Sequence, residues 1–263
     1  MRSDRDHEFT KAQAAASKLL RRFGVRDPRQ LDLEDLAMAL GVVVMDAPLL
    51  GAEARLVRQG SKKGLIRVSE DISEEGRRRF AIGHELGHWS QHQHTSQLSL
   101  CLASDVVGYR GSREELEANA FSACLLLPGR FLRETYRAAP SLDLVHTIAE
   151  ELVTTLTATA VRVVETTNDP CVVVFTDLET GRVQWWRRSS RCPRAWLQSQ
   201  QPISQLSGVS EILKGEQETA LETVDSAAWF DHVEGSEAYV VYEESMRLGN
   251  YPTAITLLAV DYR

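Results

Sequence analysis

The segment FAIGHELGHW, residues 80–89, contains two histidines four positions apart, with a glutamate directly after the first. In an α-helix, residues i and i+4 lie on one face, so His84 and His88 can direct both imidazoles at one ion while Glu85 lies beside them. This spacing is the HExxH pattern, in which two histidines bind zinc and the glutamate acts as a general base on water. These residues therefore predict a metal site on a helix.

The residues around the two histidines favour a metal site over a chance match. Phe80 and Leu86 are among several apolar residues that read as the core-facing side of this helix. Imidazole and carboxylate groups are costly to bury there unless they are paired or coordinated. Gly83 and Gly87 each cost a helix about 1 kcal/mol relative to alanine, so we expect another group to approach the helix backbone closely.

Two histidines and a water leave tetrahedral zinc one protein ligand short, and His94 is the first candidate. It stands where the pattern HExxHxxGxxH has its third histidine, but the glycine of that pattern is replaced by Gln91. A glutamine is unfavourable at a position that requires positive φ. His92 continues the i+4 series, but it lies about 12 Å along the helix from His84, too far for both to bind one ion.

The second candidate is Glu115, in the segment SREELEANAF at residues 112–121. Glu115 and Asn119 share one helical face, and a carboxylate from a second helix would complete a site of two histidines and one glutamate. Asn119 would then accept a hydrogen bond from the far ring nitrogen of a ligating histidine. Ser112 and Glu115 also have the spacing of a capping box, and Glu117 reads as a charge that suits the helix dipole. A capping role for Glu115 therefore stays open.

The segments GLIRVSEDISEEGRRRFAIGHELGHW and EELEANAFSACLLLP together resemble the ImmA/IrrE family of metallopeptidases, over roughly the first half of the chain. The resemblance implies that His84, His88 and Glu115 bind zinc, with Mn²⁺ or another divalent metal as an alternative, and that Glu85 is the catalytic acid/base. Ser122 departs from the family pattern, which tends to have alanine there.

The same resemblance implies a substrate, a cytoplasmic transcriptional repressor of the Xre (helix-turn-helix) type whose cleavage releases stress-response or mobile-element genes. We therefore expect a zinc-dependent endopeptidase in which Glu85 accepts the proton of the attacking water and passes it to the leaving amine. Tyr109 and Arg110 are candidates for stabilising the oxyanion. The alternative is a non-proteolytic regulator that binds a repressor through a metal-bound scaffold. A purely structural site needs no acid such as Glu85 beside the metal.

Composition predicts a cytoplasmic protein that stays off membranes and does not bind DNA directly. The 263 residues include no apolar run long enough to span a bilayer and no signal-peptide core at the start. The four cysteines are widely spaced and form no CxxC pair, so we interpret them as reduced thiols. A formal net charge of −7 argues against nucleic-acid binding over the whole surface.

The expected fold class is α+β, with a zincin-like metallopeptidase domain at residues 1–130 that contains a small sheet and the HExxH helix. Its opening segment, residues 12–45, predicts two amphipathic helices and a strand. Residues 131–168 predict a pair of helices that family resemblance identifies as helix-turn-helix-like. Its second helix has one basic residue, Arg162, so we interpret the pair as scaffold and not as a DNA reader.

The remaining residues, 169–263, predict a C-terminal α+β domain that resembles the GAF-like domain of the family's longer members. Its signals are a hairpin in CVVVFTDLETGRVQWWRRS, a middle helical stretch, and strands in EAYVVYEES and TAITLLAVDY. The segment RVQWWRRSSRCPRAW concentrates five arginines and three tryptophans. Such a segment can bind single-stranded nucleic acid or an acidic partner, but we favour an edge hairpin whose tryptophans pack inward.

Overall fold

The computed structural model describes residues 2–92, 101–102, 112–192, 197–230, 239–249 and 251–262. Helices and two β-sheets make it a mixed α+β structure, which confirms the predicted class. Its contacts divide the chain into two compact units, residues 1–135 with 148–159 and residues 136–147 with 160–263. The domain boundaries predicted near residues 130 and 168 stay predictions.

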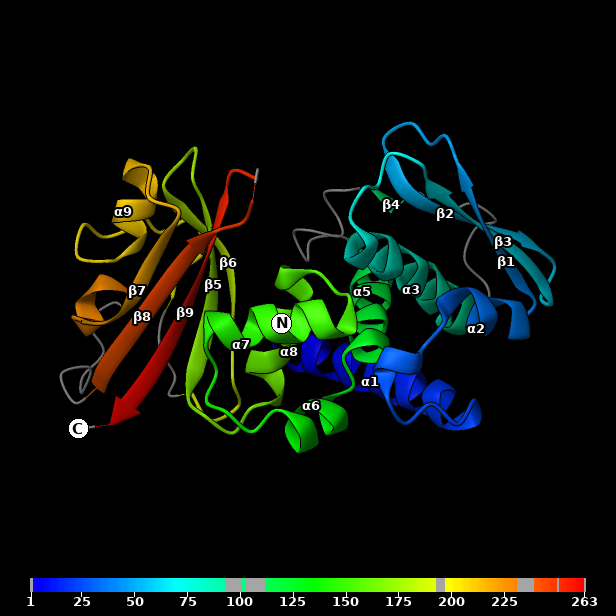
Figure 1. Ribbon diagram of the computed structural model, residues 1–263, viewed down its shortest axis with the longest axis horizontal. Coiled ribbons are helices and arrows are strands. Elements are labelled where there is room, and N and C mark those ends of the chain that lie inside the picture. Colours follow the sequence, from blue (N-terminus) through cyan, green and yellow to red (C-terminus); the bar gives the residue numbers. More distant parts are fainter. Residues whose placement is uncertain are drawn as a thin grey trace. The chain divides into compact units, whose positions relative to one another are not determined.

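The first unit contains a four-stranded sheet in the order β1-β3-β2-β4, in which β1 and β3 are parallel and the other pairs antiparallel. Its strands are β1 (Val42–Ala47), β2 (Ala52–Gln59), β3 (Lys63–Ser69) and β4 (Cys101–Leu102). Its helices are α1 (Arg2–Arg22), η1 (Pro28–Gln30), α2 (Leu33–Ala39), α3 (Glu75–Gln91), α5 (Arg113–Leu126) and α6 (Gly129–Thr135) (Figure 1). The two helices and the strand predicted at the start of the chain are thus α1, α2 and β1.

Helix α3 lies against the sheet, where it contacts β2 and β3 (Figure 1). Its central residues from Phe80 to Trp89 are all buried. An ion pair between Arg77 of α3 and Glu53 of β2, with both side chains largely withdrawn from solvent, joins the helix to the sheet. The helix that contains the two histidines is therefore fixed along its length by a buried face.

Helices α3 and α5 approach each other at the two glycines of the HExxH segment. A Cβ atom at Gly83 would lie 2.5 Å from the Ser122 hydroxyl oxygen, and one at Gly87 would lie 3.0 Å from Cα of Ala118. The Ser122 hydroxyl donates a hydrogen bond of 2.8 Å to the carbonyl of Phe80, so the serine also joins the two helices. The close approach expected at these glycines is confirmed, and the group that approaches is α5.

The predicted helical pair consists of α7 (Leu142–Leu152) and α8 (Leu156–Thr166). Each of these two helices has residues in both units. The turn between them contains Val153, whose φ of 49° lies in the left-handed region. Arg162 of α8 is only 1% exposed and forms an ion pair of 3.0 Å with Glu165. A buried guanidinium in an internal ion pair is not available for a phosphate, which agrees with the scaffold interpretation.

The second unit contains a five-stranded antiparallel sheet in the order β6-β5-β9-β8-β7. Its elements are β5 (Cys171–Asp177), β6 (Arg182–Arg188), α9 (Val209–Lys214), β7 (Glu218–Val224), η2 (Ser226–Ala228), β8 (Tyr239–Arg247) and β9 (Thr253–Tyr262) (Figure 1). The β5–β6 hairpin, β8 and β9 confirm the strands predicted from alternation. Strand β7 was not predicted, because its side chains are mostly exposed and its sequence, ETALETV, has little apolar alternation.

The arginine- and tryptophan-rich segment is built around β6, an edge strand of this sheet. The Trp185 ring is buried and stacks on Phe175 with centroids 3.8 Å apart, and the Arg187 guanidinium lies over Trp185 at 5.4 Å. Arg188 donates to the carbonyl of Cys192 at 2.7 Å. These contacts fit the interpretation as an inward-packed edge hairpin. Residues 193–196 lie outside the described part of the segment.

The structure describes the side chains of three cysteines, Cys124, Cys171 and Cys192, and all three are buried. Burial raises the pKa of the Cys171 thiol to about 12 and that of Cys192 to about 11, so both are protonated at neutral pH. Within the described ranges, no helix combines the length and the apolar character needed to cross a membrane.

Candidate metal centre

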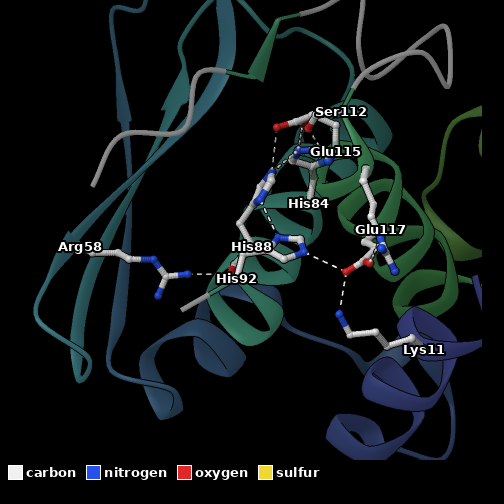
Figure 2. Close-up of polar contacts among 9 residues, drawn as sticks. Lys11, Arg58, His84, His88, His92, Ser112, Glu115 and Glu117 are labelled. Carbon is white, nitrogen blue, oxygen red and sulfur yellow. Dashed lines mark hydrogen bonds and ion pairs between the residues drawn. The ribbon is translucent and has the colours of Figure 1, made fainter. Parts of the chain in front are cut away.

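The three predicted metal ligands meet between α3 and the first turn of α5 (Figure 2). His84 Nε2 lies 3.0 Å from one carboxylate oxygen of Glu115, and His88 Nε2 lies 3.3 Å from the other. The two Nε2 atoms are 3.0 Å apart. Two imidazoles and one carboxylate thus direct their ligating atoms at a single point.

This arrangement fits a divalent metal of the kind that nitrogen and carboxylate ligands bind. Zinc bonds of about 2.0–2.2 Å in a tetrahedral site place neighbouring ligand atoms roughly 3.2–3.6 Å apart, close to the separations found here. Both imidazoles are buried, whereas the Glu115 side chain is 16% exposed. His84, His88 and Glu115 would hold the ion, and three protein ligands would leave a fourth position for water or substrate.

The electrostatics of the cluster also favour a cation. Burial lowers the pKa of His84, but the hydrogen bond to Glu115 and the charges of Glu85 and Glu115 outweigh burial and raise it above its ordinary value. Burial raises the pKa of Glu115, but hydrogen bonds and charges from His84 and His88 bring it below its usual range. Glu85 is completely buried. Two carboxylates beside two imidazoles therefore create a buried site that attracts positive charge.

Helix capping, the alternative role for Glu115, involves its backbone, whereas its side chain faces the histidines. The Ser112 hydroxyl caps α5 by accepting a hydrogen bond from the Glu115 backbone N–H at 3.4 Å. The Glu115 carboxylate is directed at the two histidines instead (Figure 2). The competing candidate, His94, lies outside the described residues, as do Tyr109 and Arg110.

The sequence profile of the peptidase family described as the IrrE N-terminal-like domain matches residues 37–163. Residues 37–163 belong to the ImmA/IrrE family. The predicted resemblance is thereby confirmed, and because the family is one of metallopeptidases, it implies a divalent metal in this chain. Each of the three convergent residues and Glu85 lies within the matched segment.

The chain is also similar to a solved structure described as a Mycobacterium tuberculosis transcriptional regulator. The two share 16% sequence identity with a TM-score of 0.62, over 98% of this chain and 80% of that chain. At this identity the similarity establishes the fold alone. A comparison with curated proteins gives no match.

In this ImmA/IrrE segment, each histidine of the cluster has a partner at its far ring nitrogen. His84 Nδ1 lies 2.8 Å from the side-chain oxygen of Asn119, which can only accept, so Nδ1 donates and the Nε2 lone pair of the neutral ring faces the proposed metal position. This confirms the contact predicted for Asn119. His88 Nδ1 lies 3.0 Å from His92 Nδ1. His92 thus contacts the site through His88, a role that its i+4 spacing in the sequence does not predict.

His92 is in turn joined to Glu117 of α5, because its Nε2 lies 3.0 Å from a Glu117 carboxylate oxygen (Figure 2). Glu117 is buried and also receives hydrogen bonds from Lys11 Nζ at 2.8 Å and Arg113 Nε at 3.2 Å. The expectation that Glu117 is a simple first-turn charge is wrong. The sequence shows that Glu117 follows Glu115 by two residues. The residue whose charge balances that of Glu117, however, is Lys11 of α1, more than a hundred residues earlier in the chain.

Arg58 of β2 is a second residue that sequence reasoning missed. It donates a hydrogen bond of 2.6 Å to the carbonyl of His88, and its guanidinium lies 4.5 Å from the centroid of the Trp89 ring. Burial lowers the pKa of Arg58, and the charge of Glu85 opposes that shift. Arg58 therefore holds the last turn of α3, where the helix dipole favours a cation, and contributes positive charge near Glu85.

Proposed function

We propose that this chain is a zinc-dependent endopeptidase that cleaves a transcriptional repressor of the Xre type and so releases the genes which that repressor silences. The observation that carries the proposal is Glu85, a fully buried carboxylate next to His84, whose charge acts on that imidazole. A site that only stabilised the fold would gain nothing from a second carboxylate of this kind. Membership in a metallopeptidase family supports the same reaction.

The proposed chemistry divides between the ion and Glu85. When bound, a divalent metal supplies a Lewis acid that activates water and polarises the scissile carbonyl. Glu85 accepts the proton from the attacking water and then delivers it to the leaving amine. Glu85 is completely buried next to His84, so its carboxylate is withdrawn from bulk water beside the proposed ion.

The repressor substrate and the wider architecture belong to the same proposal. The fold similarity to a structure described as a transcriptional regulator agrees with a regulatory role. We further propose that residues 1–130 form a zincin-like domain, that residues 131–168, which include α7 and α8, form a helix-turn-helix-like scaffold, and that residues 169–263 form a GAF-like domain. The scaffold proposal is supported by the buried ion pair of Arg162.

A reporter gene under the control of a candidate repressor tests the proposed function in cells, beginning with any helix-turn-helix repressor encoded beside this chain. Wild type should relieve repression, and Glu85→Gln, which keeps the side chain's size but removes its basicity, should not. Equal relief by the two proteins would instead establish the alternative, a regulator that binds its repressor without cutting it.

A further inference from the structure

The contacts of His92 form a continuous chain of hydrogen bonds from α1 to the metal ligands. It passes from Lys11 Nζ to Glu117, from Glu117 to His92 Nε2, and from His92 Nδ1 to His88 Nδ1, over separations of 2.8, 3.0 and 3.0 Å. In Figure 2 the same dashed path leads from Lys11 up to the imidazole of His88. His92 and Glu117 are both buried.

With Glu117 ionised and His92 neutral, the direction of every hydrogen bond in this chain follows. An ionised carboxylate can only accept, and Glu117 lies between Lys11 and Arg113, which keep it ionised. The Nε2 atom of His92 must therefore be the donor to Glu117. In a neutral imidazole the other nitrogen is then an acceptor, so His92 Nδ1 accepts and His88 Nδ1 donates.

We propose that His92 and Glu117 are positioning residues that hold His88 in the tautomer with a proton on Nδ1 and none on Nε2, the atom directed at Glu115. The inference rests on the proposed metal site but not on peptidase activity. It goes beyond the ligand set, because neither residue touches the position of the ion. Outer contacts of this kind orient a ligating histidine and raise its basicity.

The two histidines of the cluster thus have different outer partners. Asn119 serves His84 directly from α5, whereas His88 is served by a second imidazole that Glu117 orients. Asn119 and Glu117, the residues of α5 that act on His84 directly and on His88 through His92, come from the helix that also supplies Glu115. A metal ion would therefore meet a site in which α5 provides one ligand and sets the tautomer of the other two.

The test is metal affinity, measured by chelator competition with Zn²⁺ on the purified full chain at one pH. Wild type is compared with His92→Leu, His92→Asn and Glu117→Leu. Removing an outer partner typically costs 10–100-fold in metal affinity, so we expect a loss of that size in His92→Leu and Glu117→Leu. An asparagine oxygen replaces the Nδ1 acceptor of histidine, so His92→Asn should recover most of the affinity that His92→Leu loses.

Two controls separate positioning from damage to the fold. Glu134→Leu removes the acid of an exposed i,i+4 ion pair with Arg130 in the same unit and should bind Zn²⁺ as wild type does. Thermal unfolding of the metal-free proteins shows whether His92→Leu and His92→Asn are folded to the same extent. The inference is supported if His92→Asn recovers Zn²⁺ affinity while His92→Asn and His92→Leu are equally stable. A residue that only filled space would not need an acceptor atom at this position.

Each remaining outcome has a definite meaning. Wild-type affinity in both His92→Leu and Glu117→Leu overturns the positioning role and leaves the proposed metal site intact. Equal loss of affinity in His92→Leu and His92→Asn also overturns it, since the acceptor would then be irrelevant. A wild-type chain that binds no Zn²⁺ at all overturns the positioning role and the proposed metal site together.

Discussion

Glu115 has two functions at one residue, since its backbone N–H is capped by Ser112 while its carboxylate faces both histidines. If the carboxylate is the third ligand, Glu115→Ala leaves the ion with two protein ligands, and zinc content should fall to background. His94→Ala should retain zinc, because Gln91 occupies the glycine position that the His94 pattern requires. Elemental analysis of the two purified variants decides between them, and retention of zinc in Glu115→Ala would return this residue to a capping role alone.

The raised pKa of His84 makes metal binding depend on pH. A raised pKa means that the metal-free chain holds its proton to a higher pH than free imidazole, and this contribution to stability is lost as pH rises through the raised value. A metal must displace that proton, so affinity should fall on acidification by on the order of tenfold per pH unit for each proton displaced. Added Zn²⁺ should therefore raise the melting temperature more at pH 8 than at pH 6, and His84→Ala should show no such shift.

At the scale of elements, the two glycines of α3 set the distance to α5 and hence the position of Glu115 relative to the histidines. At Gly87 an added Cβ would lie 3.0 Å from Cα and 3.2 Å from the carbonyl oxygen of Ala118, both backbone atoms that cannot rotate away. Gly87→Ala should therefore displace α5, lower the free energy of unfolding by roughly 1–3 kcal/mol and weaken zinc binding.

Chemical denaturation and zinc competition measure both effects of Gly87→Ala. The matched control is Ser90→Ala, an exposed position on the same helix, whose free energy of unfolding should change by less than about 0.5 kcal/mol. A Gly87→Ala protein with wild-type stability and zinc affinity would show that the α3–α5 contact does not determine the geometry of the site.

Local patterns in the sequence were sufficient for the residues that lie on one helix or repeat a short spacing. The i, i+4 spacing predicted that His84 and His88 face one point, and the two glycines predicted a close approach. Contacts that depend on tertiary packing could not be predicted in this way. Lys11 meets Glu117 across 106 residues of sequence, and Arg58 reaches the His88 carbonyl from a strand 30 residues earlier.

At the scale of the whole molecule, strands with buried apolar side chains were predictable, and the exposed edge strand β7 was not. Strands β5, β8 and β9 carry apolar residues at alternating or continuous positions, whereas β7 is exposed along most of its length. The substrate is equally invisible in these patterns, because function depends on the site and its partner and not on the fold. The peptidase reaction must therefore be tested on the intact chain.

The most direct measurement combines purified wild type or Glu85→Gln, each loaded with Zn²⁺, with a purified candidate repressor and follows the intact masses of the products. General acid/base groups typically contribute about 10²–10⁴-fold in rate, so wild type should produce one pair of fragments and Glu85→Gln should leave the repressor whole over the same time. Glu75→Gln, at an exposed position on the same helix, should cut as wild type does. Equal cleavage by Glu85→Gln, or binding of the repressor without cleavage by zinc-loaded wild type, would contradict the proposed peptidase mechanism.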